Sequence, residues 1–292
     1  MRLRAATVLV LLAACGGSSG SGDKAPPPAV QRRQLEVAGL SRGYRLYVPL
    51  SLDRRRPAPL VLVLAGVGNP AESMVETTQL DRLADSAGFV VAYPEGVNRT
   101  WNAGYCCLLG ATTGPDDVGF LTRVIDDVAS DHRIDPARVF AVGVSAGGMM
   151  AHRLGCERPD RIAGVGSVAG AMIPDACRPA RPVSVIEIHG TADPLVPYEG
   201  GSTAGGATAP SPPTVAVAER WAELDRCPSP AATRADGPVT TATWTGCADG
   251  TGVKLITIEG GGHTWYAPLG PANGAVDATR EIWEFLSARP RR

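Results

Sequence analysis

One serine of the chain stands where a nucleophile would be expected. Ser145 lies in the run Gly143-Val144-Ser145-Ala146-Gly147, between an apolar segment typical of a β-strand and a segment with helical character. A strand, a tight turn and a helix in this order would hold the Ser145 hydroxyl above a sheet. Small flanking residues are needed because bulky side chains would clash in the turn. The alternative is a glycine-rich turn with a bystander serine.

A serine hydroxyl is a weak nucleophile until a base takes its proton, and the chain contains four His. His263 lies in the run Gly260-Gly261-Gly262-His263-Thr264-Trp265, directly after the last expected strand. A loop at the end of a strand can reach a site at the carboxyl edge of a parallel sheet, so His263 is the predicted base. The other three are expected in a solvated loop (His132), on a helix and pointing away from the serine (His152), and in a structural role at the end of a strand (His189).

Asp193 is the predicted acid that would orient the imidazole and stabilise its charged form. It follows the apolar segment Val183–His189 by one short turn. The resulting order in the chain, Ser, Asp and then His, is that of the α/β-hydrolases rather than that of chymotrypsin or subtilisin. The alternative is that Asp193 only forms a turn before Pro194. Three other acids are weaker candidates because none follows a buried strand so closely: Asp225, Asp249 and Glu259.

The elements that must position these residues alternate between strands and helices. The expected strands are Gln34–Val37, Tyr44–Val48, Leu60–Leu64, Phe89–Tyr93, Val139–Val144, Ile162–Val168, Val183–His189 and Lys254–Ile258. The expected helices are Glu72–Ala87, Asp117–Ala129 (capped by Asp116 or Asp117), Ala146–Leu154, Val215–Leu224 and Ala278–Leu286. The alternation predicts the α/β class and an α/β-hydrolase fold, a doubly wound, mostly parallel sheet with an antiparallel N-terminal edge.

The composition favours one globular domain and argues against a nucleic-acid-binding protein. The chain has 292 residues, of which 44% are hydrophobic, enough for a single sizeable core. Its formal net charge is −1 and its one basic block is Arg54-Arg55-Arg56, so we expect no nucleic-acid partner. Residues 34–292 are predicted to form one catalytic domain.

The first residues predict export. Arg2 and Arg4 precede an apolar stretch that is too short to span a bilayer, which is typical of a signal peptide, here residues 1–14. The segment ends Leu12-Ala13-Ala14-Cys15 and resembles a bacterial lipobox, so Cys15 is expected to carry a lipid that anchors the protein to a membrane. Residues 15–33 would include a Gly/Ser/Pro-rich tether. The protein would then be a lipoprotein at the bacterial cell surface or in the periplasm. The alternative is an ordinary secretory signal and a secreted protein.

The cysteines other than Cys15 form an even set of six, which fits an exported protein with disulfide bonds. We expect the pairs Cys156–Cys177 and Cys227–Cys247, each closing a loop of about twenty residues. The adjacent Cys106 and Cys107 are then left as a vicinal disulfide or as free thiols. Zinc binding is the alternative, but the chain has no CxxC and no His at ligand spacing from the cysteines, so no metal is expected.

Several motifs in order resemble the polyhydroxybutyrate depolymerase and feruloyl esterase family. They are the runs 116–120 (DDVGF), 143–150 (GVSAGGMM), 189–193 (HGTAD) with 196–198 (VPY), and 261–265 (GGHTW). The resemblance extends over nearly everything from about Tyr44 to Leu286. It implies a catalytic triad of Ser145, Asp193 and His263, in agreement with the reasoning from the residues themselves.

The resemblance also suggests substrate contacts. The run 101–104 (WNAG) with Cys106-Cys107 resembles a segment that lines the site in a lipoprotein-like branch of the family. Trp101 and Asn102 are therefore candidate contacts to the substrate, as is Trp265 beside the predicted base. A structural role for Trp101 and Asn102 is the alternative.

The expected oxyanion hole departs from the family pattern. The backbone N–H of Ala146 can point at the developing oxyanion, and relatives usually carry a His-Gly pair after the third strand, where a second N–H completes the hole. Here that place reads Leu64-Ala65-Gly66-Val67-Gly68, with Ala65 in place of His. We expect a backbone donor from Gly66 or Val67 because only the N–H is needed. The change puts the shape of the loop, and so the rate, in question.

The predicted function is hydrolysis of carboxylic esters in two steps. Ser145 attacks the ester carbonyl with His263 as base, an acyl-enzyme forms, and water activated by His263 releases the acid. No cofactor is expected. The candidate substrates are polyhydroxyalkanoates, feruloyl or acetyl groups on polysaccharide, and short-chain esters. The alternatives are a serine peptidase or acyltransferase, and a cell-surface binding lipoprotein on a catalytically weak hydrolase scaffold.

Overall fold

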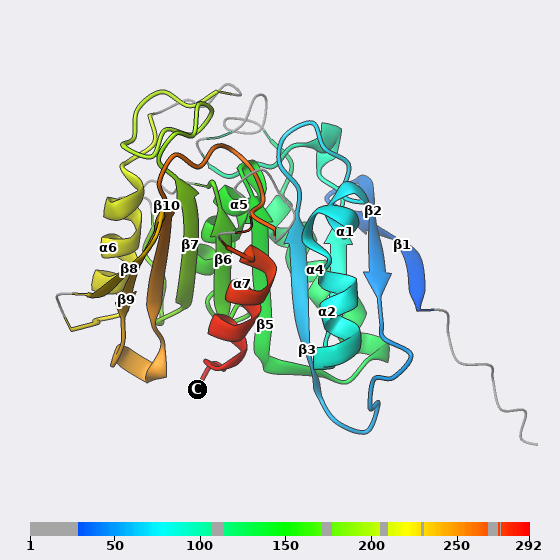
Figure 1. Ribbon diagram of the computed structural model, residues 1–292. Coiled ribbons are helices and arrows are strands. Elements are labelled where there is room, and N and C mark those ends of the chain that lie inside the picture. The colour runs from blue at the N-terminus through cyan, green and yellow to red at the C-terminus, as the bar shows by residue number, and fades with distance from the viewer. Residues whose placement is uncertain are drawn as a thin grey trace, which may run out of the picture.

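The structure is a computed structural model that describes residues 29–104, 106, 114–170, 177–204, 210–228, 231–267, 274 and 276–292. Within these residues the centre is a ten-stranded sheet in the order β1-β2-β4-β3-β5-β6-β7-β10-β9-β8 (Figure 1). The strands are β1 (Val30–Val37), β2 (Leu40–Tyr47), β3 (Ala58–Leu64), β4 (Val90–Pro94), β5 (Ile134–Val144), β6 (Gly164–Val168), β7 (Ser184–Gly190), β8 (Ala232–Asp236), β9 (Val239–Trp244) and β10 (Val253–Ile258). The strands from β4 to β10 in that order run parallel, and the pairs at both ends are antiparallel.

Helices cover both faces of the sheet. On one face lie α4 (Asp117–Asp131), α5 (Ala146–Glu157) and α6 (Thr214–Leu224), and on the other α1 (Ser73–Thr78), α2 (Leu80–Ala87) and α7 (Ala278–Ser287) (Figure 1). Two short 3₁₀ turns lie at Val97–Arg99 and Ala248–Gly250. β3 shows how one apolar run serves both faces, since Leu60, Leu62 and Leu64 belong to the first core and Val61 and Val63 to the second.

The parallel strands bring their carboxyl ends to one edge of the sheet, the upper edge in Figure 1. The segments after β7 and β10 are joined there, because the Ala192 N–H donates to the Gly261 carbonyl oxygen at 2.9 Å. The loops that follow β3, β5, β7 and β10 therefore meet at this edge, and they carry Gly66, Ser145, Asp193 and His263. The fold thus assembles residues that are far apart in the sequence.

The predicted fold class is confirmed, including the antiparallel N-terminal edge. β1 begins earlier than expected, inside the predicted tether, because Val30 to Arg33 pair with β2. A second antiparallel hairpin, β8 with β9, closes the opposite edge and was not predicted. All of β8 is exposed, so this edge strand has no apolar face whose pattern could reveal it.

The helix expected over residues 72–87 is in fact two. The chain breaks at Gln79, whose φ of +55° is left-handed, and α1 and α2 lie on either side of it. Asp116, not Asp117, caps α4, since its side chain accepts the Gly119 N–H at 2.7 Å. No helix among the described residues is long and apolar enough to cross a bilayer.

Two disulfide bonds, Cys156–Cys177 and Cys227–Cys247, join the pairs expected from the spacing. The first ties the end of α5 to the segment before β7, and the second ties the segment after α6 to the segment before β10. Both bonds therefore lie toward the end of the sheet at which the parallel strands begin, opposite the end that carries Ser145. Cys106 is buried and disulfide-bonded, which excludes a free thiol there. Cys107, Cys15 and the predicted signal peptide lie outside the described residues.

Candidate active site

Ser145 stands at the turn between β5 and α5 in a strained backbone conformation, with φ +56° and ψ −126°. The turn passes so close to β3 that a Cβ on Gly147 would lie 2.0 Å from the Leu64 carbonyl oxygen. A Cβ on Gly143 would lie 2.4 Å from the Gly147 carbonyl carbon. Only glycine fits at either position, which is the physical reason for the Gly-x-Ser-x-Gly pattern. The turn places Ser145 at the carboxyl edge of the sheet.

Asp193 is buried and its carboxylate is fully engaged. Oδ2 lies 2.8 Å from His263 Nδ1, and Oδ1 accepts the N–H groups of Leu195 at 2.8 Å and Val196 at 2.9 Å. Burial opposes ionisation, but hydrogen bonds from His189, from His263 and from these N–H groups outweigh it and hold the pKa of Asp193 well below its usual range. The residue therefore forms the turn that sequence reasoning offered as the alternative and also contacts the imidazole.

His263 is held by this carboxylate at the end of its glycine-rich loop. A carboxylate on Nδ1 selects the tautomer that carries its proton there, which leaves Nε2 as the acceptor of the neutral ring. Among the described residues, the side chain of His263 is hydrogen-bonded to Asp193 and makes no hydrogen bond to Ser145. The structure thus joins two of the three predicted triad members directly and brings the third to the same edge.

His189 is a second imidazole on the same carboxylate. Its Nε2 lies 3.2 Å from Asp193 Oδ2 and 2.9 Å from the Val196 carbonyl oxygen. Burial lowers the pKa of His189, but the contacts with Asp193 and Glu187 outweigh it and raise that pKa to about 9. Sequence reasoning gave His189 a structural role and missed this contact. The two residues are four positions apart on one tight turn, but this spacing alone does not specify the contact.

The loop after β3 lies against the serine. A Cβ on Gly66 would be 3.3 Å from Ser145 Cβ, which puts the backbone of this loop beside the predicted nucleophile. The N–H groups of Gly66, Val67 and Ala146 donate to no residue that the structure describes. Unpaired N–H groups beside a nucleophile can stabilise a developing oxyanion. A histidine at position 65 is not needed for that, because the donors belong to the backbone.

Trp101 supports this loop from behind. Its ring is 2% exposed, and its indole N–H donates to the Ala65 carbonyl oxygen at 2.9 Å. The backbone N–H of Asn102 donates to Asp117 at 2.6 Å, and Asp117 forms a buried ion pair with Arg42 at 2.7 Å. The segment is therefore tied to the protein itself, as the structural alternative expects, and a substrate contact of Trp101 or Asn102 stays a prediction.

Trp265 is likewise buried in the core, and a substrate contact there stays a prediction. It is 5% exposed, and its indole N–H donates to Thr279 of α7 at 3.0 Å. On the other side of the same loop, the Tyr266 hydroxyl donates to the Gly262 carbonyl oxygen at 2.6 Å. The loop that carries His263 is thus fixed both to α7 and to itself.

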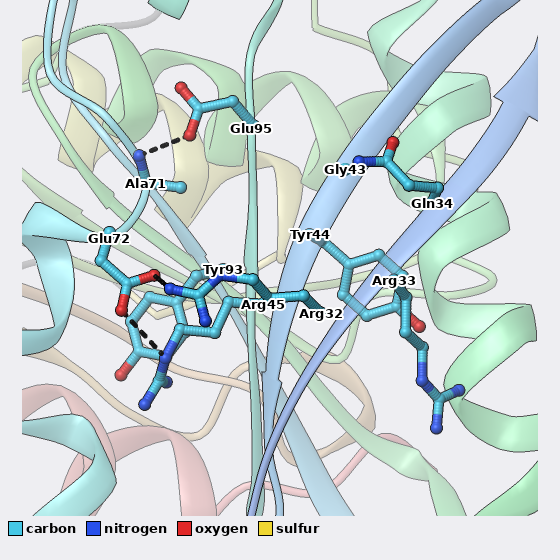
Figure 2. Close-up of a pocket in the computed structure, with 10 residues that line it drawn as sticks. All are labelled: Arg32, Arg33, Gln34, Gly43, Tyr44, Arg45, Ala71, Glu72, Tyr93 and Glu95. Carbon is cyan, nitrogen blue, oxygen red and sulfur yellow. Dashed lines mark hydrogen bonds and ion pairs between the residues drawn. The ribbon is translucent and has the colours of Figure 1, made fainter.

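A polar cavity of about 280 Å³ lies between β1, β2 and β4 and the end of the segment that follows β3 (Figure 2). Its described lining contains no Ser, Cys or His side chain. Glu72 forms ion pairs with two arginines of this lining, Arg32 at 3.0 Å and Arg45 at 3.5 Å. Arg45 also pairs with Asp81 at 2.7 Å. The cavity is therefore no candidate for acyl transfer. Within the described ranges no group of three or more His, Cys, Asp or Glu side chains is placed to hold a metal ion.

Comparison with known proteins identifies the family of the chain. Residues 42–242 match the family described as Esterase PHB depolymerase. The chain is 38% identical to the protein named "Putative esterase NocK" of Nocardia uniformis subsp. tsuyamanensis, over 93% of its own length and 91% of the relative's. It is 30% identical to Feruloyl esterase B of Piromyces equi over 74% of its own length, and it spans 41% of that protein.

Solved structures show the same fold. The acetyl xylan esterase from Aspergillus awamori superposes with a TM-score of 0.61 at 16% identity, covering 88% of this chain and 99% of that one. The family match spans more than half of the chain and includes the Ser145 turn and the Asp193 loop. The chain therefore belongs to the Esterase PHB depolymerase family and is a carboxylic ester hydrolase with the α/β-hydrolase fold.

Proposed function

We propose that the protein hydrolyses esters through an acyl-enzyme on Ser145, with His263 as general base and Asp193 as the residue that orients it. The observation that carries the proposal is the 2.8 Å contact between Asp193 Oδ2 and His263 Nδ1, on loops at the sheet edge that bears the strained Ser145 turn. Ser145 and His263 share no hydrogen bond in the free protein. Contacts of this kind tighten when substrate binds.

In the first step, Ser145 Oγ attacks the ester carbonyl while its proton passes to His263 Nε2. The negative charge that develops on the carbonyl oxygen faces the free N–H groups of Ala146 and of Gly66 or Val67. One such donor contributes about 10²- to 10³-fold to kcat. His263 then protonates the departing alcohol, and in the second step it takes a proton from water, which hydrolyses the acyl-enzyme.

Replacement of the nucleophile tests this mechanism. The purified wild type is expected to hydrolyse p-nitrophenyl acetate and butyrate, and Ser145→Ala is expected to lower kcat by at least about 10³-fold. Ser130→Ala, an exposed serine on α4, is the matched control and should retain wild-type rates. Equal activity of wild type and Ser145→Ala would refute the assignment of the nucleophile. A wild type as inert as the variant would favour the binding-lipoprotein alternative, and cleavage of peptides would favour the peptidase.

We further propose feruloyl or acetyl esters, carried on a polysaccharide or on a small alcohol, as the substrate class. The support is the names of two relatives, Feruloyl esterase B at 30% identity and the bifunctional acetylxylan esterase/xylanase XynS20E of Neocallimastix patriciarum at 27%. Methyl ferulate, an acetylated xylan and hydroxybutyrate oligomers compared at equal ester concentration test it. A preference for the hydroxybutyrate oligomers by more than about tenfold in kcat/KM would move the proposal to polyhydroxyalkanoates.

We also propose that the protein is exported and anchored through a lipid on Cys15. The two disulfide bonds support an oxidising compartment. In a bacterial host the full chain should partition with membranes, and Cys15→Ser should release it into the soluble or culture fraction. A wild type that is itself soluble outside the cell would instead support the ordinary secretory signal.

A further inference from the structure

Behind Asp193 a row of buried polar side chains leads away from the site and into the core. His189, on β7, stands between two carboxylates, with Nε2 at 3.2 Å from Asp193 Oδ2 and Nδ1 at 3.5 Å from Glu187 Oε1. On the other side of Glu187, Oε2 lies 2.9 Å from His152 Nε2. The indole N–H of Trp221 donates to His152 Nδ1 at 3.0 Å. His152, Glu187 and His189 expose no surface, and the proposed reaction uses none of them.

The proton positions follow from the chemistry at the inner end of the row. An indole N–H only donates, so His152 Nδ1 accepts, and the proton of the neutral ring is on Nε2 and is donated to Glu187 Oε2. Complete burial opposes ionisation of Glu187, but the contacts with His152 and His189 outweigh it and lower its pKa. Its Oε1 is buried without a hydrogen bond of ordinary length, and in the described part of the chain His189 Nδ1 is the cationic group within ion-pair range.

His189 can supply the missing positive charge. Its Nε2 faces two acceptors, the Val196 carbonyl oxygen and Asp193 Oδ2, so it carries a proton. Its Nδ1 faces Glu187 Oε1 and, at 3.3 Å, the hydroxyl of Thr214 on α6. A neutral ring that accepted from Thr214 would leave two buried carboxylates without a counter-charge, which is a costly arrangement. Among the described residues no Lys or Arg pairs with either carboxylate.

The other groups packed around this ring do not supply a competing charge. Tyr198 contacts it edge-on with ring centroids 5.8 Å apart, and burial raises the pKa of that phenol, which keeps it neutral. From the neighbouring strands the sheet register brings two hydroxyl side chains, Thr257 of β10 beside His189 and Ser167 of β6 beside Glu187. The charge on His189 is therefore set by Glu187 and Asp193.

We propose that His189 is a protonated positioning residue that shares the Asp193 carboxylate with His263, and that Glu187 is buried in order to hold that charge. The proposal rests on the proposed function, since it concerns the base of that reaction. A positive charge on the far side of Asp193 offsets part of the attraction that this carboxylate exerts on a proton of His263. The charge on His189 therefore acts on the proposed base through the carboxylate that the two imidazoles share, and the pH dependence of the reaction is where it should be seen.

The charge on His189 is measurable without any enzyme assay. With only four His in the chain, imidazole ¹⁵N spectra can be assigned by comparison with single variants. We expect both ring nitrogens of His189 to be protonated between about pH 5 and 7.5 in the wild type and in Ser145→Ala. A neutral ring at about pH 6 would overturn the proposal, whether or not the protein is an esterase.

The effect on the base is measured in the pH profile of kcat/KM. His189→Gln removes the charge and keeps an N–H donor near the position of Nε2. It should move the acid limb to higher pH by about one unit. The value of kcat/KM then falls about tenfold on that limb and much less at higher pH. Glu187→Gln, which removes one of the two carboxylates beside His189, should change the ¹⁵N signals of that ring. His132→Gln is the matched control, at the opposite end of β5, and should leave the profile unchanged.

The outcomes separate this proposal from the proposed function. A uniform loss of kcat/KM at all pH values in His189→Gln, with the acid limb in place, would mean that the residue is only structural. Full activity of Ser145→Ala would refute the mechanism while leaving the spectroscopic result for His189 intact. Thermal unfolding of each variant identifies one that fails to fold, and the wild-type spectra then decide alone.

Discussion

At the scale of single residues, the Ser145 turn depends on the absence of side chains at Gly143 and Gly147. The atoms that meet an added Cβ at Gly147 are backbone atoms of β3, which cannot rotate away as the end of a side chain can. A methyl group there must push the turn and the strand apart. The geometry between the nucleophile and the N–H groups of the β3 loop depends on that distance.

Gly147→Ala is therefore expected to lower the free energy of unfolding by about 1–3 kcal/mol. It should also lower kcat/KM by at least about tenfold, because displacement of a reacting group by an ångström is that costly. Chemical denaturation and ester hydrolysis measure the two effects. Gly43→Ala is the control, since its Cβ meets only the flexible amide end of Gln34. Wild-type kinetics for Gly147→Ala would contradict the close approach.

Ser145 and His263 could be predicted because each lies in a local sequence pattern. A glycine on each side of a serine after an apolar run, and His263 at the end of a strand, are visible in the chain. Whether a tryptophan faces solvent is not a local property, and both Trp101 and Trp265 are buried by elements distant in sequence. The contact of His189 with Asp193 depends equally on the path of a turn that types and spacing do not specify.

At the scale of elements, the segment around Trp101 acts as a support for the β3 loop. The indole N–H is a donor to the Ala65 carbonyl, and Phe in its place would keep most of the ring but lose that donor. A buried carbonyl left without a partner costs about 1–3 kcal/mol. Trp101→Phe should therefore lower kcat severalfold through the loop while KM changes little.

Steady-state kinetics with p-nitrophenyl butyrate and thermal unfolding test this expectation. Trp283→Phe is the matched control, because Trp283 stacks on Phe89 with ring centroids 4.0 Å apart and lies on α7. If Trp101→Phe changed KM and left kcat as in the wild type, the indole would contact substrate, as the family resemblance suggested.

The main strands could be predicted because buried parallel strands are continuous apolar runs, as in β3. β8 and β9 could not, because an exposed edge hairpin carries no such run and its identity depends on pairing with β10. The break at Gln79 is a tertiary effect as well. Gln79 is of a residue type that favours helices, yet it adopts a left-handed conformation that a glutamine does not require.

At the scale of the whole molecule, stability is coupled to pH through Asp225, which joins the end of α6 to the start of β7. Its Oδ1 accepts the Val183 N–H at 3.0 Å, and its Oδ2 is buried without a hydrogen-bond partner. Burial raises the pKa of Asp225 to about 7. As the pH rises from about 4 to about 7, the unfolded chain releases this proton and the folded protein retains it. The contribution of Asp225 to the free energy of unfolding therefore falls over that range.

Asp225→Asn removes this titration and keeps the shape and the acceptor. The difference in Tm between variant and wild type should be small near pH 4 and should grow in favour of the variant up to about pH 8. Asp236→Asn, on the exposed strand β8, is the control and should show no such trend. A constant difference at every pH would mean that Asp225 does not titrate in the folded protein.

The position of the two disulfide bonds has a practical consequence for making the protein. Both lie toward the amino edge, on the side of the sheet away from the Ser145 turn, and each joins the end of a helix to the entry of a strand. A reducing host would thus weaken the base of the molecule through these two bonds, whereas the bond at Cys106 belongs to the segment that supports the β3 loop beside Ser145. Expression in a reducing cytoplasm should then cost yield and shelf life through the two bonds at the base, and turnover per folded molecule through the bond at Cys106.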